Sequence, residues 1–384
     1  MTRQTVPING SVLEWARQEA GLTVAALAEN LKVEPDVVLA WESNEAKPSK
    51  GQFTKLVDRL KRPSAVFFLP QPPQTSALPT AFRRAPGLHG HDLGTEELKH
   101  IRRARRLQQI AEWAQRDADQ PAVDFPRATT SDNASTVGTG FRDYLGLTIE
   151  TQLAWKTASE ASREWRKHLE DVGVLVLQLS MGKSSVRGFS AWSDRAPLVA
   201  LNTAYHPTAR IYTLLHEAAH LVTRTDSACF DFVAPSSHDQ ALERWCEQFA
   251  AAVLLPAVTV RQHVAASVGH GAQVTDVATV RRLANRFKSS SRAMSLRLQE
   301  LGLARPTLYA AVVHALSSYD WNDAGGGGGG QPRVEKRLGE LGPRAIDILM
   351  SASDRGRLHQ RDLADHLRLT ASQVDDLRVM LRSA

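Results

Sequence analysis

Apolar residues recur at helical spacing through the first part of the chain. From Ser11, "SVLEWARQEAGLTVAALAENLKVEPDVVLAWE" and the residues that follow place apolar positions three or four apart, separated by short polar turns. This pattern predicts four or five short helices within residues 1–73. The proline-rich stretch "FFLPQPPQTSALPTAF" then ends the helical domain, because proline lacks a backbone donor. A hinge is expected at about residues 70–80, and a charged amphipathic helix is expected to run to about Ala118.

The period of the pattern changes in the middle of the chain. Three short runs, "GVLVLQL", "VRGFSAW" and "APLVALN", are β-branched-rich or alternating, and turn residues bound them. They predict three strands. Two helices are expected next, one over about Thr208–Val222 and one over about Gln240–Leu255 that stops at Pro256. A small sheet together with separate helices predicts an α+β fold.

The last part of the chain is set apart by composition. Six consecutive glycines at 325–330 predict a flexible linker. Beyond them, "LADHLRLTASQVDDL" follows the rhythm of "LAENLKVEPDVVLAW" near the amino terminus, which we interpret as a similar helical device and not as a sequence repeat. The predicted organisation is a helical domain (1–73), a charged helical linker (74–133), a domain with the small sheet (134–270), a helical subdomain (271–324), the glycine linker (325–332) and a carboxyl-terminal helical domain (333–384).

Composition narrows the class of protein. With 384 residues, 42% of them hydrophobic, two to four domains are expected. No run of about 18 apolar residues occurs and the start lacks an apolar signal, so we expect no membrane span and a cytoplasmic location. Only Cys229 and Cys246 are present, too few for a disulfide framework, which indicates reduced thiols. A net charge of +6 is compatible with nucleic acid or acidic partners and requires neither.

The stretch "HEAAH" carries the clearest chemistry. His216 and His220 are four residues apart, so on a helix both imidazoles can reach a single cation. Glu217 projects beside that face, where it can serve as a general base. A catalytic zinc site also needs a third protein ligand. The following helix, "DQALERWCEQFAAAVLLP", offers Glu243, a carboxylate at the edge of an apolar stripe that needs a partner. Together these residues predict a Zn²⁺ site of two histidines and one glutamate.

Plainer interpretations exist for each of these residues. Two histidines four apart on a helix can simply be surface residues. Cys246 is interpreted as a buried core thiol and not as a metal ligand. Four further residues flank the motif as candidates for oxyanion or substrate binding, although loop roles are favoured for them: His206, Asp226, Asp231 and His238. The glycine run does not follow a strand or open a helix, which argues against a phosphate-binding loop.

The two helical stretches also carry a family resemblance. "RIYTLLHEAAHLV" together with "LERWCEQFAAAVLLP" resembles the ImmA/IrrE family of metallopeptidases, over about residues 134–320. The resemblance implies a zincin-like domain in which His216, His220 and Glu243 bind zinc and Glu217 is the catalytic base. The chain departs from the family in having Glu247 where asparagine is usual. This change is expected to affect local packing more than the metal.

Residues from about 11 to 69 resemble a Cro/repressor-type (XRE) helix-turn-helix domain, whose second helix enters the major groove of DNA. Here that helix is expected to present Glu34, Asp36, Asn44 and their neighbours. From Gly10 to Arg62 there are 8 cations and 8 anions, so 8 − 8 = 0, and a neutral domain neutralises few phosphates. Basic residues lie just beyond, and by themselves they indicate a solvated helix face: Arg83, Arg84, Lys99, Arg102, Arg103, Arg105 and Arg106. Two interpretations stay open, that the domain binds DNA with help from this segment or that it docks a protein.

These features predict an intracellular zinc-dependent endopeptidase. By the resemblance, its protein substrate is a helix-turn-helix repressor, which implies a role in transcription regulation and stress response. The amino-terminal domain would bring the enzyme to DNA or to a DNA-bound protein. The alternative is a helix-turn-helix transcriptional regulator whose zinc domain acts as a sensor without turnover. A third hypothesis gives the zinc a purely structural role, and the oligomeric state is left open.

Overall fold

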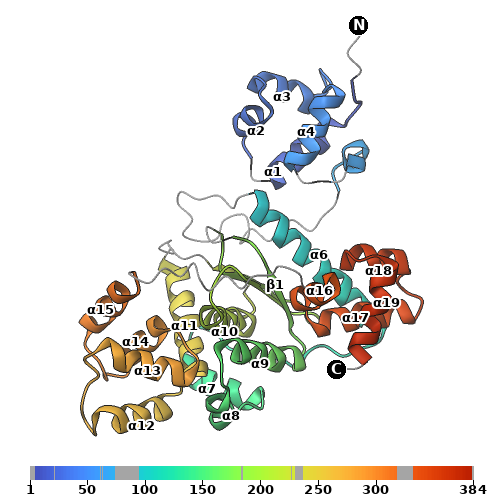
Figure 1. The fold of residues 1–384 in the computed structure, drawn as a ribbon. Helices are drawn as coiled ribbons and strands as arrows, with labels where there is room; N and C mark the ends of the chain where they lie inside the picture. The colour runs from blue at the N-terminus through green and yellow to red at the C-terminus, as the bar shows by residue number, and fades with distance from the viewer. Residues whose placement is uncertain are drawn as a thin grey trace. The chain divides into compact units, whose positions relative to one another are not determined.

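The computed structural model describes residues 5–20, 22–60, 62, 64–73, 95–182, 185–225, 227–229, 237–317 and 332–382 (Figure 1). The chain divides into two compact units, Met1–Arg103 and Ala104–Ala384. Several features predicted from the sequence lie outside the described residues: the hinge beyond residue 73, Arg83, Arg84 and the glycine run at 325–330.

The first unit is helical in its described part, as the apolar pattern predicts. Its core includes Leu27, Trp41, Leu56 and Phe67, each at most 2% exposed. The elements are α1 (Gly10–Glu19), α2 (Val24–Leu31), α3 (Pro35–Glu42), α4 (Lys50–Leu60), the 3-10 helix η1 (Ser64–Phe68) and the first turns of α6 (Thr95–Asp117).

The second unit combines helices with one small sheet, which confirms the α+β class. Its helices are the rest of α6, α7 (Ala134–Tyr144), α8 (Ile149–Ala154), α9 (Ala158–Asp171), α10 (Pro207–Thr223), α11 (Ser237–Leu254), α12 (Ala257–Val268), α13 (Val277–Phe287), α14 (Ser291–Glu300), α15 (Pro306–Ser317), α16 (Arg333–Leu341), α17 (Pro343–Asp354), α18 (Gln360–Leu367) and α19 (Ala371–Arg382). Its strands are β1 (Leu175–Leu179), β2 (Gly188–Ala191), β3 (Leu198–Asn202) and β4 (Ser227–Cys229).

The sheet is mixed, with strand order β1-β3-β2-β4 in the described part of the chain. β1 runs parallel to β3, whereas β2 is antiparallel to both β3 and β4. The three predicted strands are confirmed. The fourth has only three residues, too few for a recognisable period. Helices α9 and α10 pack on the sheet (Figure 1), where Val176 and Val199 share a core with Leu214 and Ala218.

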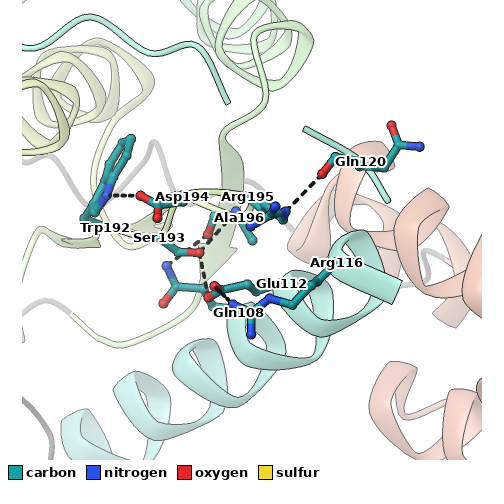
Figure 2. A network of polar contacts seen from close by, with 9 residues as sticks. All are labelled: Gln108, Glu112, Arg116, Gln120, Trp192, Ser193, Asp194, Arg195 and Ala196. Carbon is teal, nitrogen blue, oxygen red and sulfur yellow. Dashed lines mark hydrogen bonds and ion pairs between the residues drawn. The ribbon is translucent and has the colours of Figure 1, made fainter. Parts of the chain in front are cut away.

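The second half of α6 is fastened to the turn between β2 and β3. Gln108 is 2% exposed, and its Nε2 donates to the carbonyls of Ala191 and Ala196 at 2.8 and 2.9 Å. One turn further on, Glu112 accepts a hydrogen bond from Ser193 Oγ at 2.8 Å (Figure 2). This part of the stretch predicted as a linker is therefore packed against the sheet.

The carboxyl-terminal helices cover the free edge of β1. Arg166 on α9 is buried, and it donates to the carbonyl of Val176 at 2.5 Å and to that of Gly339 on α16 at 2.6 Å. Glu170 pairs with the same guanidinium at 3.1 Å. Because an uncovered strand edge invites pairing with other chains, α16 both protects the sheet and ties residues 333–382 to it.

The carboxyl end of α11 is clamped by side chains from three other helices. Its last carbonyls have no partners within the helix, because Pro256 follows. They accept hydrogen bonds from buried polar side chains of α7, α8 and α14: Val253 O from Arg142 Nη1 (2.7 Å), Leu254 O from Gln152 Nε2 (3.0 Å) and Leu255 O from Arg297 Nε (2.9 Å). These contacts fix the position of the helix that carries Glu243.

Within the described residues, no single helix has the length and apolar composition that a membrane span requires. A bent pair of helices, 240–254 with 257–268, passes by length and composition alone. Its first helix supplies Cys246, Phe249 and Val253 to the hydrophobic core, each 0% exposed.

Replacing Arg142 by Met should lower the free energy of unfolding by about 1–3 kcal/mol, because the carbonyl of Val253 and Oε1 of Gln152 would stay buried without their donor. Urea unfolding followed by circular dichroism measures the difference. Arg163→Met, at an exposed position of α9, is the matched control and should unfold at the wild-type urea concentration. Equal midpoints for both variants would contradict the clamp.

Candidate metal centre

Helix α10 buries its polar residues along with its apolar ones. It begins at Pro207, a residue favoured at the first helical position, after His206 at the N-cap. His216, Glu217 and His220 are 4%, 0% and 1% exposed. Buried polar side chains need partners. The interpretation of the motif as two surface histidines is therefore wrong.

The partner comes from α11. Glu243 Oε2 lies 3.1 Å from Nε2 of His216, and Glu243 Oε1 lies 3.5 Å from Nε2 of His220. The two Nε2 atoms are 3.3 Å apart. The structure thus brings together the three residues that the sequence predicts as ligands, although 23 residues separate His220 from Glu243 in the chain.

These separations suit a metal ion. Two atoms bonded at about 2.0–2.1 Å to a tetrahedral ion lie about 3.3 Å apart. The observed distances scatter around that value. Two imidazole nitrogens and one carboxylate oxygen form a donor set that zinc and similar divalent ions accept. In the described part of the chain, this is the one group of three or more His, Cys, Asp or Glu side chains close enough to share an ion.

Electrostatics prepares the ligands for a cation. Burial, together with the neighbouring His216, lowers the pKa of His220 to about 3, so its ring is neutral at pH 7. Burial alone would lower the pKa of His216, but Glu243, Glu217 and Glu247 outweigh it and raise that pKa. Burial would raise the pKa of Glu243, yet the hydrogen bond from His216 and the electrostatic attraction of the two histidine rings lower it. The site therefore holds an ionised carboxylate next to imidazoles, which a divalent cation would balance.

Thr225 orients the second histidine. Its Oγ1 lies 3.0 Å from Nδ1 of His220, and its backbone N–H donates to the carbonyl of the same residue at 2.9 Å. With Nδ1–H donating to the hydroxyl, Nε2 keeps its lone pair and faces the other ligands. Sequence reasoning missed Thr225, because its position depends on the left-handed turn at Arg224 (φ 58°), which a sequence pattern does not reveal.

That turn is itself held in place. The Arg224 guanidinium lies 3.4 Å from the centre of the Trp192 ring, a cation–π contact. It also donates to the carbonyls of Phe125 and Pro126, at 2.8 and 3.1 Å. Trp192 belongs to the turn between β2 and β3 that α6 fastens (Figure 2). The end of the motif helix is thus tied to the sheet.

Gly188 on β2 allows the sheet to approach the motif helix. A Cβ at this position would lie 2.7 Å from Cγ2 of Thr213, 2.9 Å from the carbonyl oxygen of Ala200 and 3.5 Å from Cγ of Glu217. The first two separations are shorter than a Cβ atom tolerates from a carbon or an oxygen, so only glycine fits without a shift of the strand or the helix. Its missing side chain sets how closely β2 passes Glu217.

The remaining predicted residues have different outcomes. Cys246 is fully buried in the core, as interpreted. His206 caps α10, accepting at Nδ1 from the backbone N–H of Thr208. Three others lie outside the described residues: Asp226, Asp231 and the side chain of His238.

Glu247 follows Glu243 by one turn of α11. The residue is exposed, yet partial desolvation raises the pKa of its carboxyl, while His216 lowers that pKa and Glu243 raises it. The departure from asparagine at this position thus places a second carboxyl near two of the predicted ligands. That the change affects packing more than the metal stays a prediction.

A buried HExxH helix with a carboxylate from the following helix is typical of the metal sites of metal-dependent hydrolases. Residues 169–299, about a third of the chain, match the family model of peptidase M78, described as an IrrE N-terminal-like domain. The match supports the ImmA/IrrE family for this part of the chain and indicates a metallopeptidase-type function. It covers α10, α11 and the four strands of the described sheet. No curated protein matches the chain significantly.

Replacing Thr225 by Val should weaken zinc affinity roughly 10- to 100-fold, because the change removes the group that orients His220 while keeping the side chain's shape. Competition with a chromophoric chelator measures the affinity. Thr225→Ser retains the hydroxyl and should bind within a few-fold of wild type. A Val variant with wild-type affinity would show that Thr225 does not position the ring.

Replacing Gly188 by Ala should destabilise the protein by about 1–3 kcal/mol, since strand and helix must separate to admit the methyl group. Gly140→Ala on α7 is the control, because its added Cβ meets nothing within 4 Å and alanine favours a helix. Calorimetric melting temperatures compare them: Gly188→Ala should fall and Gly140→Ala should equal or exceed wild type. Equal melting of the two variants would refute close packing at Gly188.

Proposed function

We propose that the protein is a cytoplasmic zinc-dependent endopeptidase, in which His216, His220 and Glu243 bind the metal and Glu217 is the general base. The convergence of three ligand atoms within 4.8 Å of one another, beside a fully buried glutamate, carries this proposal. The family match over the same residues supports it. When bound, zinc would polarise a peptide carbonyl and lower the pKa of water to about 7.

The protein's own residues supply the proton transfers. Glu217 directly follows His216, so its carboxylate belongs to the same helical turn as the first ligand. It would accept the proton of the attacking water and pass it to the departing amine, which allows the C–N bond to break. The Glu243 side chain is 36% exposed, compared with 5% and 2% for the histidines. The substrate would therefore reach the site from the side of α11.

The substrate is proposed to be a polypeptide, and the resemblance favours a helix-turn-helix repressor, cleaved to change transcription. The surface of α3 favours protein docking over DNA binding by the first unit. Glu34 at its N-cap and Asp36 in its first turn are exposed at the end of the helix that would enter the major groove, where the negative potential of DNA disfavours carboxylates. Leu39 on the same helix is 49% exposed. Lys47 donates to Ile8 O and Asn44 Oδ1, so its ammonium is already engaged.

The alternative, a regulator that senses metal without turnover, requires the three ligands but gives no use to Glu217. In the enzyme hypothesis this buried carboxylate is the general base next to the first predicted ligand. Its replacement therefore separates the two hypotheses.

The Glu217→Gln variant should retain zinc, and its rate of substrate cleavage should fall about 100-fold or more, because the amide has no basic oxygen to accept the proton. The assay co-expresses the full chain with helix-turn-helix repressors encoded by neighbouring genes and detects fragments by mass spectrometry. Glu335→Gln, an exposed position on α16, is the control. Cleavage that persists undiminished in Glu217→Gln would contradict the proposed base.

A further inference from the structure

Three pairs of helices in the described part of the chain share one construction: α2–α3 in the first unit, and α13–α14 and α18–α19 in the second. In each pair a three-residue turn, 32–34, 288–290 or 368–370, joins the helices. The first turn residue is a cation in the left-handed conformation: Lys32, Lys288 and Arg368, with φ of 57°, 56° and 52°. A turn of this length is the one that joins the two helices of a helix-turn-helix.

The three pairs also bury equivalent positions. Each first helix buries a leucine and, four residues later, a leucine or phenylalanine, and each second helix buries two positions three residues apart. In chain register these sets are Leu27, Leu31, Val38 and Trp41; Leu283, Phe287, Met294 and Arg297; and Leu363, Leu367, Val374 and Leu377. The register holds over 15 residues in all three, so their solvent-facing positions can be compared one by one.

Five surface positions distinguish the pairs. They are Ala25, Ala26, Glu29, Asn30 and Asp36 in α2–α3; Arg281, Arg282, Asn285, Arg286 and Arg292 in α13–α14; and Arg361, Asp362, Asp365, His366 and Ser372 in α18–α19. With histidine neutral, their charges are 0 − 2 = −2, 4 − 0 = +4 and 1 − 2 = −1. Only the middle pair is basic.

The basic pair lies in a basic part of the chain. Residues 257–317 contain eight arginines and lysines and two acidic residues, so 8 − 2 = +6, which equals the net charge of the whole chain. The cations are Arg261, Arg281, Arg282, Arg286, Lys288, Arg292, Arg297 and Arg305. The excess positive charge is thus concentrated in about a sixth of the sequence.

The arginines of α13 gather on its exposed side. Arg282 and Arg286 lie one turn apart and Arg281 is next to Arg282, away from the buried Leu283 and Phe287. Arg286 Nη1 contacts the carbonyl of Leu153 at 3.3 Å, a neutral group, so this contact leaves its charge uncompensated. Exposed cations on one helix can contact neighbouring phosphates.

The second helix of the pair presents its amino-terminal end. Arg292 is exposed in the first turn of α14, just after the N-cap Ser290, which accepts from the backbone N–H of Ala293 at 3.1 Å. In helix-turn-helix proteins, this end of the second helix contacts the bases while the first helix crosses the backbone. Leu296, 48% exposed on α14, is the lone large apolar residue exposed on the described surface of this pair.

We propose that α13–α14 is a helix-turn-helix that binds duplex DNA, with Arg281, Arg282 and Arg286 on phosphates and the start of α14 in the major groove. DNA is favoured over an acidic protein, because protein interfaces need an apolar centre and this surface offers cations around one leucine. The biological role of this contact rests on the proposed function: it would bring the peptidase to a repressor bound at its operator. The pair α2–α3 would dock protein.

The test measures DNA binding by the full chain. Fluorescence anisotropy of a labelled duplex of about 30 base pairs is recorded between about 50 and 200 mM salt. The triple variant Arg281→Gln, Arg286→Gln, Arg292→Gln should bind at least about tenfold more weakly near 150 mM salt, and its salt slope should fall by about 2–3. The matched control, Arg333→Gln, Arg361→Gln, Arg368→Gln, removes equal charge at exposed positions of the carboxyl-terminal helices and should bind like wild type.

Zinc content and melting temperature establish that both triple variants are folded. Glu217→Gln should bind DNA like wild type, so loss of the peptidase proposal would leave this result unchanged. Equal weakening in the two triple variants would overturn the proposal, since binding would then follow net charge. Wild-type protein that does not bind DNA at the lowest salt would also overturn it and assign the cations to an acidic protein.

Discussion

The burial of a polar stripe on α10 is the constraint on which the rest of the site depends. His216, Glu217 and His220 are withdrawn from water inside a packed core, and such groups are stable there only with partners. Glu243 is the partner from the protein, and a cation would complete the set. The surrounding features hold this arrangement: the clamp on α11 positions Glu243, Gly188 sets the distance to the sheet, and Thr225 orients a ring.

Local spacing explains what could be predicted. Residues four apart share a helix face whatever surrounds them, so the two proposed ligands on α10 and the carboxylate of Glu243 could be predicted from the sequence, as could three strands with clear β composition. Thr225 was not visible, because a backbone turn places it. The effect of Glu247 on His216 depends on how α11 is rotated against α10, and Gln108 gains its role only through contact with a turn 83 residues later.

The relation between the three helix pairs could also be predicted from the sequence only in part. Residues 27–41 and 363–377 share an apolar spacing that can be recognised in the sequence. The pair at 283–297 is harder to recognise, because Phe287 and Arg297 stand where the first pair has Leu31 and Trp41. The left-handed turns and the buried positions show that the three pairs are equivalent. The pairs differ mainly in surface charge. We propose on this ground that α2–α3 docks protein and that α13–α14 binds DNA.

We propose that His216, His220 and Glu243 hold a zinc ion beside Glu217. An anomalous difference map from crystals of the full chain, measured at the zinc absorption edge, would show this ion and its ligands. We expect a single strong peak about 2.0–2.2 Å from Nε2 of both histidines and from an oxygen of Glu243, with Glu217 not bonded to it. A map without a peak there, or with the metal bound by Glu217 in place of Glu243, would contradict it.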